Sequence, residues 1–358
     1  MQVSMRTLAL LFVLASHGWA LPTFAQVATS VPPPVPGAPA VTIERIEVHS
    51  PAIEGNLEGN PADRHVLVVL PPGYASHPQR RYPVLYALHG YSIGAEQWIG
   101  EIHVPQTIEG AFAQGTREMI VVLPDSRSVH NGSMYSRSAT TGDFENFIAR
   151  DLVAYIDAHY RTLPHRGSRG LAGHSMGGYG TARIGMNHAD VFGALYMMSP
   201  CCLSPFDAAR IDPKAMAALE QLKSPKDSEG LQWGERAMLA TASAWSPDPQ
   251  RPPLYLDLPA KDGQVDAGVL ARWTANAPLA FIDQRIGDLR RYRAIAIDVG
   301  DRDGLVADAT RLHEVLDRYG IANTFEVYSG DHTSGVAARF QDHVLPFFGR
   351  HLQFDASQ

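Results

Sequence analysis

The chain has 358 residues, of which 45% are hydrophobic and 19% are charged, a composition typical of globular proteins. Its formal net charge of −7 and its pI near 6.1 argue against nucleic-acid binding, because lysine and arginine are scattered along the chain and form no basic cluster. The only two cysteines, Cys201 and Cys202, are adjacent, so they cannot crosslink distant segments or form a zinc site by themselves. We expect two reduced, partly buried thiols, with a strained vicinal disulfide as the alternative.

The N-terminus carries the pattern of an export signal. Arg6 precedes the short apolar run 8–15, and the small residues Thr23 and Ala25 suit cleavage after Ala25. The run is far shorter than the ~20 residues of a membrane span. We therefore predict a signal peptide over residues 1–25, with a retained interfacial helix as the alternative, and export to a periplasm or the medium. Residues 26–40 are predicted to be a proline-rich tether.

Strand and helix patterns alternate from residue 41 onward, which predicts a single domain over residues 41–358. Strands are predicted over residues 41–50, 65–74, 82–90, 118–125, 168–175, 191–199, 293–300 and 324–330. Helices are predicted over residues 144–160, 176–188, 305–320 and 334–351. This alternation indicates an α/β fold with a mostly parallel sheet between two helical layers, whose first two strands form an antiparallel edge. Residues 203–292 break the rhythm, and we expect an insertion above the sheet near the active site.

The stretch Gly173-His174-Ser175-Met176-Gly177 lies where a predicted strand ends and a helix begins. G-x-S-x-G in this context is typical of a nucleophile elbow, a tight turn that exposes the serine hydroxyl. Gly173 and Gly177 are the small residues that such a turn needs, because the positions on either side of the serine come very close together. We therefore expect Ser175 to be a nucleophile.

A serine nucleophile needs a base and an acid that orients the base, and in this kind of fold they follow the serine in the order acid, then histidine. His332, in the loop after the last strand, is the best base. The acid is expected after the preceding strand, where Asp303 is favoured and Asp301 is the alternative, while Asp298 still lies within the strand pattern. A calcium loop does not fit this segment, because the first and last ligand positions lack acidic residues.

The negative charge of an acyl-transfer transition state needs two backbone N–H donors. We assign them to Met176, directly after the nucleophile, and to Tyr91, in the loop after the third strand. His89 is expected to shape that loop through hydrogen bonds. Other residues near the predicted elbow are candidate substrate contacts, with ordinary packing as the alternative: Trp98, Met134, Tyr135 and His174.

Six motifs in the chain, LPPGY, YPVLYALHGY, IVVLPD, GHSMGGYG, GDRDG and GDHTSG, occur in an order that resembles the esterase D-like "putative esterase" family of α/β-hydrolases. That family includes S-formylglutathione hydrolases, feruloyl and acetylxylan esterases and mycolyltransferases. The resemblance implies an α/β-hydrolase fold over about residues 43–348. It also places the family's triad on Ser175, Asp303 and His332 and its oxyanion donors on Tyr91 and Met176, and it implies no cofactor or metal. The proline-rich tether and the 203–292 segment depart from the family pattern and leave the substrate open.

The sequence thus predicts an exported serine carboxylesterase that acts through an acyl-enzyme. Feruloyl, acetyl or other carbohydrate-linked esters and small aryl or alkyl esters are the expected substrates, and export argues against an intracellular thioester role. An acyltransferase with the same triad and an alcohol or sugar acceptor is the main alternative. A non-catalytic binding protein on a hydrolase scaffold is the other.

Overall fold

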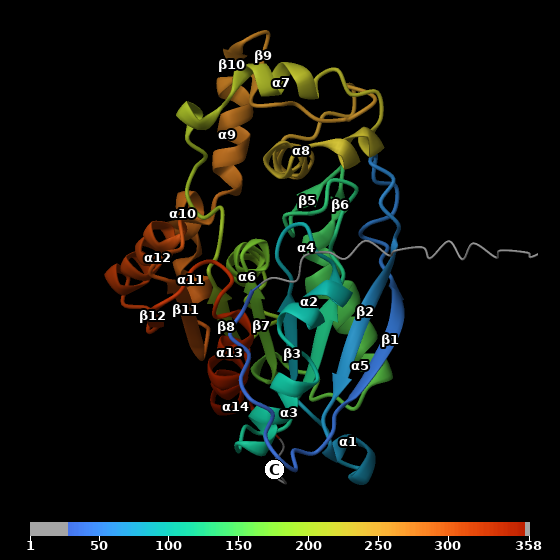
Figure 1. Cartoon of the computed structure of the whole chain (residues 1–358), viewed down its shortest axis with the longest axis vertical. Helices are drawn as coiled ribbons and strands as arrows, with labels where there is room; N and C mark the ends of the chain where they lie inside the picture. The colour runs from blue at the N-terminus through green and yellow to red at the C-terminus, as the bar shows by residue number, and fades with distance from the viewer. Residues whose placement is uncertain (1–27, 355–358) are drawn as a thin grey trace, which may run out of the picture.

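The structure is a computed structural model that describes residues 28–354 (Figure 1). Its core is an eight-stranded sheet in the order β1-β2-β4-β3-β7-β8-β11-β12. The strands are β1 (Thr42–His49), β2 (Asp63–Leu70), β3 (Val84–Leu88), β4 (Ile120–Pro124), β7 (Arg169–His174), β8 (Ala194–Met198), β11 (Ala294–Gly300) and β12 (Thr324–Tyr328). Neighbours from β4 to β12 pair in parallel, whereas β2 pairs antiparallel with both β1 and β4. The predicted mostly parallel sheet with an antiparallel edge is confirmed.

Helices cover both faces of the sheet, because its central strands are apolar on both sides. Along β2, Val66 and Val68 pack into one core while Leu67 and Val69 pack into the other. The first face is covered by α4 (Phe144–Asn146), α5 (Leu152–His159), α6 (Met176–Asn187) and α12 (Val306–Arg318). The second face is covered by α2 (Ala95–Glu101), α3 (Gln106–Ala113), α13 (Val336–Arg339) and α14 (Leu345–His351).

Two of these helices, α2 and α3, were not predicted. Gly100 and Pro105 interrupt the stretch that forms them, so no single helical period runs through it. A short helix, α1 (Gly73–Ser76), follows β2, and short strands β5 (Arg137–Ser138) and β6 (Gly142–Asp143) form a separate hairpin.

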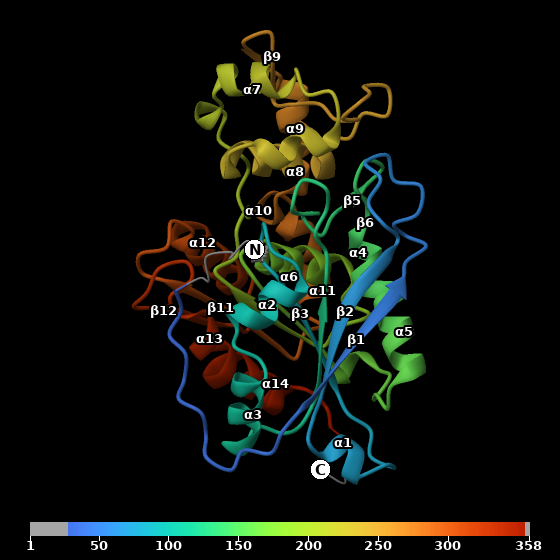
Figure 2. The ribbon, with the colours of Figure 1, turned by 45° about the vertical axis from the view of Figure 1, so that its right-hand side comes forward.

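Most of the predicted insertion stands above the carboxyl ends of the parallel strands, whereas residues 278–289 return to the first face of the sheet and pack against α6 (Figures 1 and 2). The insertion contains α7 (Pro213–Leu219), α8 (Trp233–Trp245), the hairpin β9 (Ala260–Lys261) and β10 (Gln264–Val265), α9 (Ala267–Asn276), α10 (Pro278–Phe281) and α11 (Ile286–Leu289). Buried hydrogen bonds fix it to the body: Trp245 Nε1 donates to Ser136 Oγ over 3.0 Å, and Ser138 Oγ donates to the Ser243 carbonyl over 2.5 Å. The insertion is therefore anchored at the end of the sheet where ligands of α/β folds bind.

The described part of the predicted tether lies against the domain. Ser30 N–H donates to the Ser334 carbonyl over 2.7 Å, and Ala338 N–H donates to the Ser30 carbonyl over 3.1 Å. Gln106 Nε2 donates to the Pro32 carbonyl. Residues 28–40 thus run along α13 and α3 instead of extending away as a free spacer (Figure 2). The predicted signal peptide lies outside the described residues.

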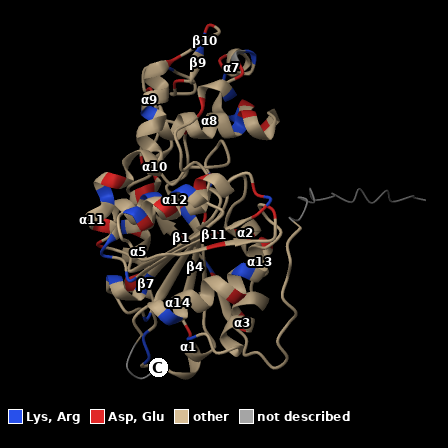
Figure 3. Ribbon diagram, turned by 90° about the vertical axis from the view of Figure 1, so that its left-hand side faces the viewer, with Lys and Arg blue, Asp and Glu red and all other residues tan. Residues whose placement is uncertain are grey.

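Acidic and basic side chains are interspersed on the outer helices, as α11 and α12 show (Figure 3). Mixed signs give this face no continuous basic stripe. Within residues 28–354, none of the helices has the length and hydropathy that a membrane crossing requires.

Candidate active site

Ser175 occupies the turn between β7 and α6 in a strained conformation, with φ 57° and ψ −114°. A positive φ is rare for a residue with a side chain and marks a backbone held by its surroundings. A Cβ added to Gly173 would lie 2.3 Å from the Gly177 carbonyl oxygen, and one added to Gly177 would lie 2.2 Å from the Leu88 carbonyl oxygen. Both glycines are therefore required by close backbone approach, as the sequence pattern indicated.

Two hydrogen-bonding contacts, both made by His332, link the three side chains predicted to form a triad. His332 Nε2 is 2.9 Å from Ser175 Oγ, and His332 Nδ1 is 2.8 Å from Asp303 Oδ2. Ser175 follows β7, Asp303 follows β11 and His332 follows β12, so the carboxyl ends of three strands in one half of the sheet carry the three groups. The arrangement allows the imidazole to accept the serine proton while the carboxylate holds the opposite ring nitrogen.

Asp303 is buried but remains suited to act as an anion. Burial alone would raise the pKa of Asp303, but the hydrogen bond and charge of His332 outweigh it and hold that pKa below its usual value. The other carboxylate oxygen, Oδ1, accepts the Leu305 N–H over 3.0 Å. These contacts fix the carboxylate in place against the imidazole.

The two other aspartates near this turn do not contact His332. Asp298 is buried within β11 and accepts hydrogen bonds of 2.7 Å from Tyr196 Oη and from Arg339 Nε. Asp301 Oδ1 accepts the Gly330 N–H over 3.0 Å. Both carboxylates therefore make hydrogen bonds between neighbouring segments at this end of the sheet.

The backbone N–H groups of Tyr91 and Met176 donate to no described residue, so both are available to an incoming oxygen. Met176 opens α6, where backbone N–H groups lack partners and the helix dipole favours negative charge. The preceding Gly90 lies against the nucleophile, because a Cβ placed there would be 3.5 Å from Ser175 Cβ. Met176 follows Ser175 in the chain, and Tyr91 follows the glycine that packs against Ser175, so both N–H groups lie near the nucleophile.

His89 holds the Tyr91 loop through both ring nitrogens, as expected from the sequence. Its Nδ1 donates to the Gly90 carbonyl over 2.8 Å, and its Nε2 accepts the Ser126 N–H over 2.8 Å. Burial lowers the pKa of His89, which agrees with a neutral ring that donates at one nitrogen and accepts at the other. Tyr135 Oη donates to the His89 carbonyl over 3.0 Å.

The structure buries Trp98 and His174, two of the four candidate substrate contacts, which favours the alternative of ordinary packing for both. Their exposed fractions are 1% and 4%. His174 Nε2 donates to the backbone carbonyl of His332 over 2.8 Å, and the two imidazole rings lie 4.7 Å apart. The Trp98 ring stacks on the other side of His174 at 6.1 Å. Burial lowers the pKa of His174 to about 3, so this ring is neutral. It packs against His332 and does not face solvent.

Met134 and Tyr135, the other two predicted substrate contacts, are also buried, at 3% and 0% exposure. Both have positive φ, 52° and 43°, which turns the chain inward behind the Tyr91 loop. The backbone reversal could not be read from the residue types, so these positions appeared to lie on an open loop.

Two residues at the site were not singled out as site residues from the sequence. Trp233, on the insertion, is 67% exposed, and its ring meets the Tyr91 ring edge-on at 5.3 Å. Glu101 ends α2; burial raises its pKa to about 7, although the charge of His332 acts in the opposite direction. The only sequence signal for Trp233 was its position in the insertion expected near the site. Nothing in the sequence pointed to Glu101.

A buried acid–imidazole pair lies where the insertion meets the body. Glu58 Oε1 is 3.2 Å from His130 Nε2, and the opposite ring nitrogen is 2.8 Å from Ser228 Oγ of the insertion. Asn60 Nδ2 donates to the other Glu58 oxygen over 2.7 Å. Burial raises the pKa of Glu58 to about 7, against the hydrogen bonds of Asn60 and Ser243, and lowers that of His130 to about 3. Near neutral pH the His130 ring is therefore neutral, while Glu58 is only partly ionised.

Cys201 and Cys202 are free thiols beside the elbow. Their sulfurs lie 2.7 Å apart, and the Cys201 N–H donates to the Ser175 carbonyl over 3.2 Å. The hydrogen bond with Cys202, together with burial, raises the pKa of Cys201, so this thiol is protonated at neutral pH. The two thiols thus lie next to the turn that carries Ser175.

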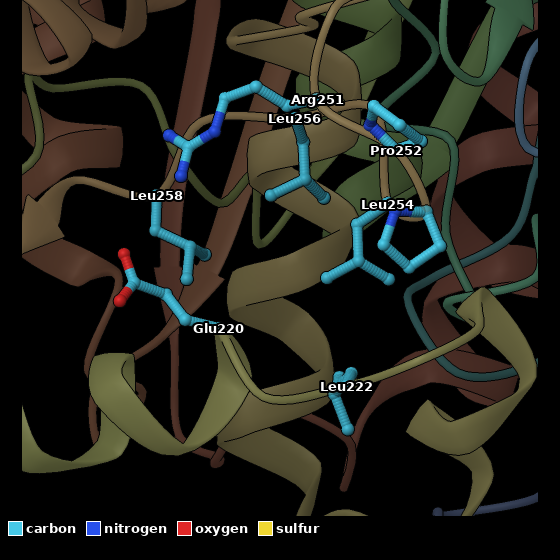
Figure 4. Close-up of a pocket in the computed structure, with 8 residues that line it drawn as sticks. Glu220, Leu222, Arg251, Pro252, Leu254, Leu256 and Leu258 are labelled. Atoms are coloured by element: carbon cyan, nitrogen blue, oxygen red, sulfur yellow. The ribbon is translucent and has the colours of Figure 1, made fainter.

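A hollow within the insertion is separate from these groups (Figure 4). Its volume is about 80 Å³, well below the roughly 300 Å³ at which ligand pockets begin. It is lined mainly by prolines and leucines, with Glu220 and Arg251 at its rim. Among residues 28–354, no group of three or more His, Cys, Asp or Glu side chains is placed to hold a metal ion.

The chain matches known proteins over most of its length. The family model described as "Putative esterase" matches residues 59–344. An endo-1,4-beta-xylanase/feruloyl esterase of Xylanibacter ruminicola is 28% identical over 153 residues, which are 42% of this chain and 21% of that protein. The chain thus aligns with about a fifth of the length of this curated relative.

Solved structures share the fold. A ferulic acid esterase superposes with a TM-score of 0.61 at 24% identity and covers 87% of this chain and 99% of its own. The S-formylglutathione hydrolase of Staphylococcus aureus superposes with a TM-score of 0.55 at 17% identity and covers 86% and 97%. These likenesses confirm the predicted α/β-hydrolase fold.

Proposed function

The chain belongs to the putative esterase family, and from this premise we propose that it is a serine esterase that works through an acyl-enzyme. The observation that carries the proposal is the 2.9 Å contact between His332 Nε2 and Ser175 Oγ on a strained strand–turn–helix. A serine on a strained turn, with its hydroxyl beside an oriented imidazole, is the arrangement that makes a serine nucleophilic.

Acylation begins when Ser175 Oγ attacks the ester carbonyl and His332 Nε2 takes its proton. Asp303 holds the ring through Nδ1 and stabilises the imidazolium that forms. The carbonyl oxygen becomes negative and receives hydrogen bonds from the Tyr91 and Met176 N–H groups. His332 then returns the proton to the departing alcohol, which leaves the acyl group on Ser175.

Deacylation repeats the same steps with water. His332 accepts a proton from the water molecule, the resulting hydroxide attacks the acyl carbonyl, and the same two N–H groups stabilise the second oxyanion. Collapse of this intermediate breaks the bond to Ser175 Oγ, and His332 returns the proton to the serine. The acid product is released, and the site returns to its starting state.

Feruloyl or acetyl esters and other carbohydrate-linked esters are the proposed substrates. The names of the Xylanibacter relative and of the ferulic acid esterase support this choice. We also propose that the protein is exported to the periplasm or the medium after cleavage near Ala25. Carbohydrate-linked esters are found outside the cell. Export argues against an intracellular thioester substrate.

Acyl transfer to an alcohol or sugar remains the second candidate, because the same triad serves both reactions. Product analysis separates them: a transferase forms a new ester in the presence of an acceptor alcohol, whereas a hydrolase releases free acid at the same rate with or without it.

The test of the proposal is hydrolysis of p-nitrophenyl acetate and of a panel of esters that differ in their acid and alcohol halves. The wild type should hydrolyse some of them, and Ser175→Ala should be inactive with a nearly unchanged melting temperature. Absence of turnover by a folded wild type across the panel would contradict the proposal.

A further inference from the structure

Trp233 is unusual among the large apolar side chains of residues 28–354. It is 67% exposed, more than Val327 at 46% or Val265 at 45%, which are the next most exposed. A tryptophan has the largest apolar surface of any residue, so leaving it in water forgoes stabilisation that burial would provide. Exposed aromatic surface beside a catalytic site is therefore a candidate ligand contact.

The ring is held in place although it is exposed. It opens α8, whose start is closed by the Gln232 N–H donating to Glu235 Oε2 over 3.0 Å. Three residues on, Arg236 donates to the Val129 carbonyl over 2.6 Å, and this ties the helix to the loop beneath it. Trp233 therefore stands on a fixed element and not on a free loop end.

Tyr91 connects this ring to the reacting atoms. Its own ring meets Trp233 at 5.3 Å with an interplanar angle of 86°, and its hydroxyl donates to the His130 carbonyl over 2.9 Å. The same residue supplies one of the two oxyanion donors. Trp233 therefore lies against the side chain of a residue that we assign to the oxyanion hole.

The position relative to His332 decides which half of an ester meets Trp233. The leaving alcohol must lie by His332 Nε2, which returns the proton to it. The rest of the acid half extends from the carbonyl carbon on the side away from the leaving alcohol. The Tyr91 side chain contacts Trp233, the His130 carbonyl and the segment around Gly132, which belong to the insertion and to the loop that supports it. None of these contacts belongs to the loop that carries His332, so we assign Trp233 to the acyl side.

We propose that Trp233 is a specificity-determining residue: its exposed ring forms one wall of an acyl subsite that selects esters with a planar, aromatic acid half. The inference rests on the proposed esterase function and deepens it. A planar conjugated acyl group can stack on an indole, whereas a short alkyl acyl group gains little from it.

The experiment compares two acid halves in wild type, Trp233→Ala and Trp233→Phe. For each, kcat/KM is measured with methyl cinnamate and with p-nitrophenyl acetate, and their ratio is the acyl preference. In Trp233→Ala this ratio should fall roughly tenfold through a higher KM for methyl cinnamate, because an aromatic pair is worth about that factor. Trp233→Phe, which keeps an aromatic ring, should restore most of it.

Val265→Ala is the matched control. Val265 is also exposed and lies on the insertion, but in the β9–β10 hairpin at the far end from the sheet (Figure 1). It should keep the wild-type ratio. An unchanged ratio in Trp233→Ala would overturn the proposal. So would a change confined to a series of acetate esters that differ only in the alcohol, because that result would place Trp233 on the leaving-group side.

A binding arm separates this inference from the esterase proposal. Methyl cinnamate is titrated into Ser175→Ala and into the Ser175→Ala/Trp233→Ala double variant, and dissociation constants are measured by calorimetry. Binding should weaken roughly tenfold in the double variant. Equal affinities would refute the acyl wall even if the wild type is an esterase, whereas an inactive wild type with unequal affinities would refute the esterase and leave the subsite standing.

Discussion

Gly132→Ala should damage the oxyanion hole without touching the triad. Gly132 lies in the loop below the insertion, and its φ is not in the left-handed region, so its backbone accepts an alanine. The obstacle is contact: the new Cβ would be 2.5 Å from Tyr91 Cδ2 and 2.8 Å from Met176 Sδ. These side chains belong to the two residues whose N–H groups are proposed to bind the oxyanion.

The size of the effect follows from these distances. Carbon atoms pack at about 3.5–4.0 Å, so the Tyr91 ring must retreat by about 1 Å. A displacement of that size at a catalytic group can reduce the rate about 10²-fold, close to the effect of losing one oxyanion donor. We expect kcat to fall by about 10² and KM to change little, since the oxyanion exists only in the transition state. Overpacking should also lower stability by about 1–3 kcal/mol.

The assay is steady-state hydrolysis of p-nitrophenyl acetate, with thermal unfolding to show that the variant is folded. Gly287→Ala, on α11, is the control, because a Cβ there would meet nothing within 4 Å and should leave both measurements unchanged. Wild-type kcat in a folded Gly132→Ala protein would refute the assignment of the oxyanion hole to Tyr91 and Met176.

Asp303→Asn should reduce kcat by about 10⁴ in a protein that still melts cooperatively, because an amide cannot stabilise the imidazolium as the carboxylate does; a loss below tenfold in ester hydrolysis would contradict the role of Asp303. Gly177→Ala should lower the free energy of unfolding by about 3 kcal/mol or more in urea titrations, because its Cβ would meet the Leu88 carbonyl oxygen at 2.2 Å and neither backbone can move freely. Glu58→Gln should make the protein lose more stability in acid. In the wild type, unfolding takes up a proton at His130 between pH 6.5 and about 3, which lowers stability as pH falls. Unfolding also releases a proton from Glu58 between pH 4.5 and about 7, which raises stability as pH falls. The variant keeps only the first effect and should lose about 2 kcal/mol more than wild type between pH 6.5 and 5, and parallel curves of melting temperature against pH would rule out the raised pKa of Glu58.

The arrangement of the sheet was predictable because its central strands are buried on both faces. Continuous apolar runs such as the one that forms β3 are typical of central strands, and the turn around Ser175 depends on close backbone approach at Gly173 and Gly177. The loops after β11 and β12 then deliver Asp303 and His332 to the same edge because the strands are parallel neighbours. This part of the site depends on topology and local turn chemistry, which the sequence carries.

The sequence could not decide between substrate contact and ordinary packing for four candidate residues, because the answer depends on which way a loop folds. Trp98 and His174 are aromatic residues close to the elbow in the chain, but the structure uses them as a buried stack behind His332. Met134 and Tyr135 turn inward through positive φ angles that their residue types do not favour.

Trp233 could not be placed from the sequence for a related reason. It follows Tyr91 by more than a hundred residues, and only the docking of the whole insertion brings the two rings together. The hydrogen bonds that dock it, such as His130 to Ser228, join loops without any periodic pattern. Long-range contacts of this kind leave no local signal.

The most direct test of the central claim is covalent labelling of the nucleophile. A fluorophosphonate reacts with a serine that an oriented imidazole activates, and intact-mass measurement followed by peptide mapping reports how many groups attach and where. We predict one adduct per chain, on Ser175, and none in His332→Ala at the same reagent concentration. Labelling on another serine, or no labelling of folded wild-type protein, would contradict the account.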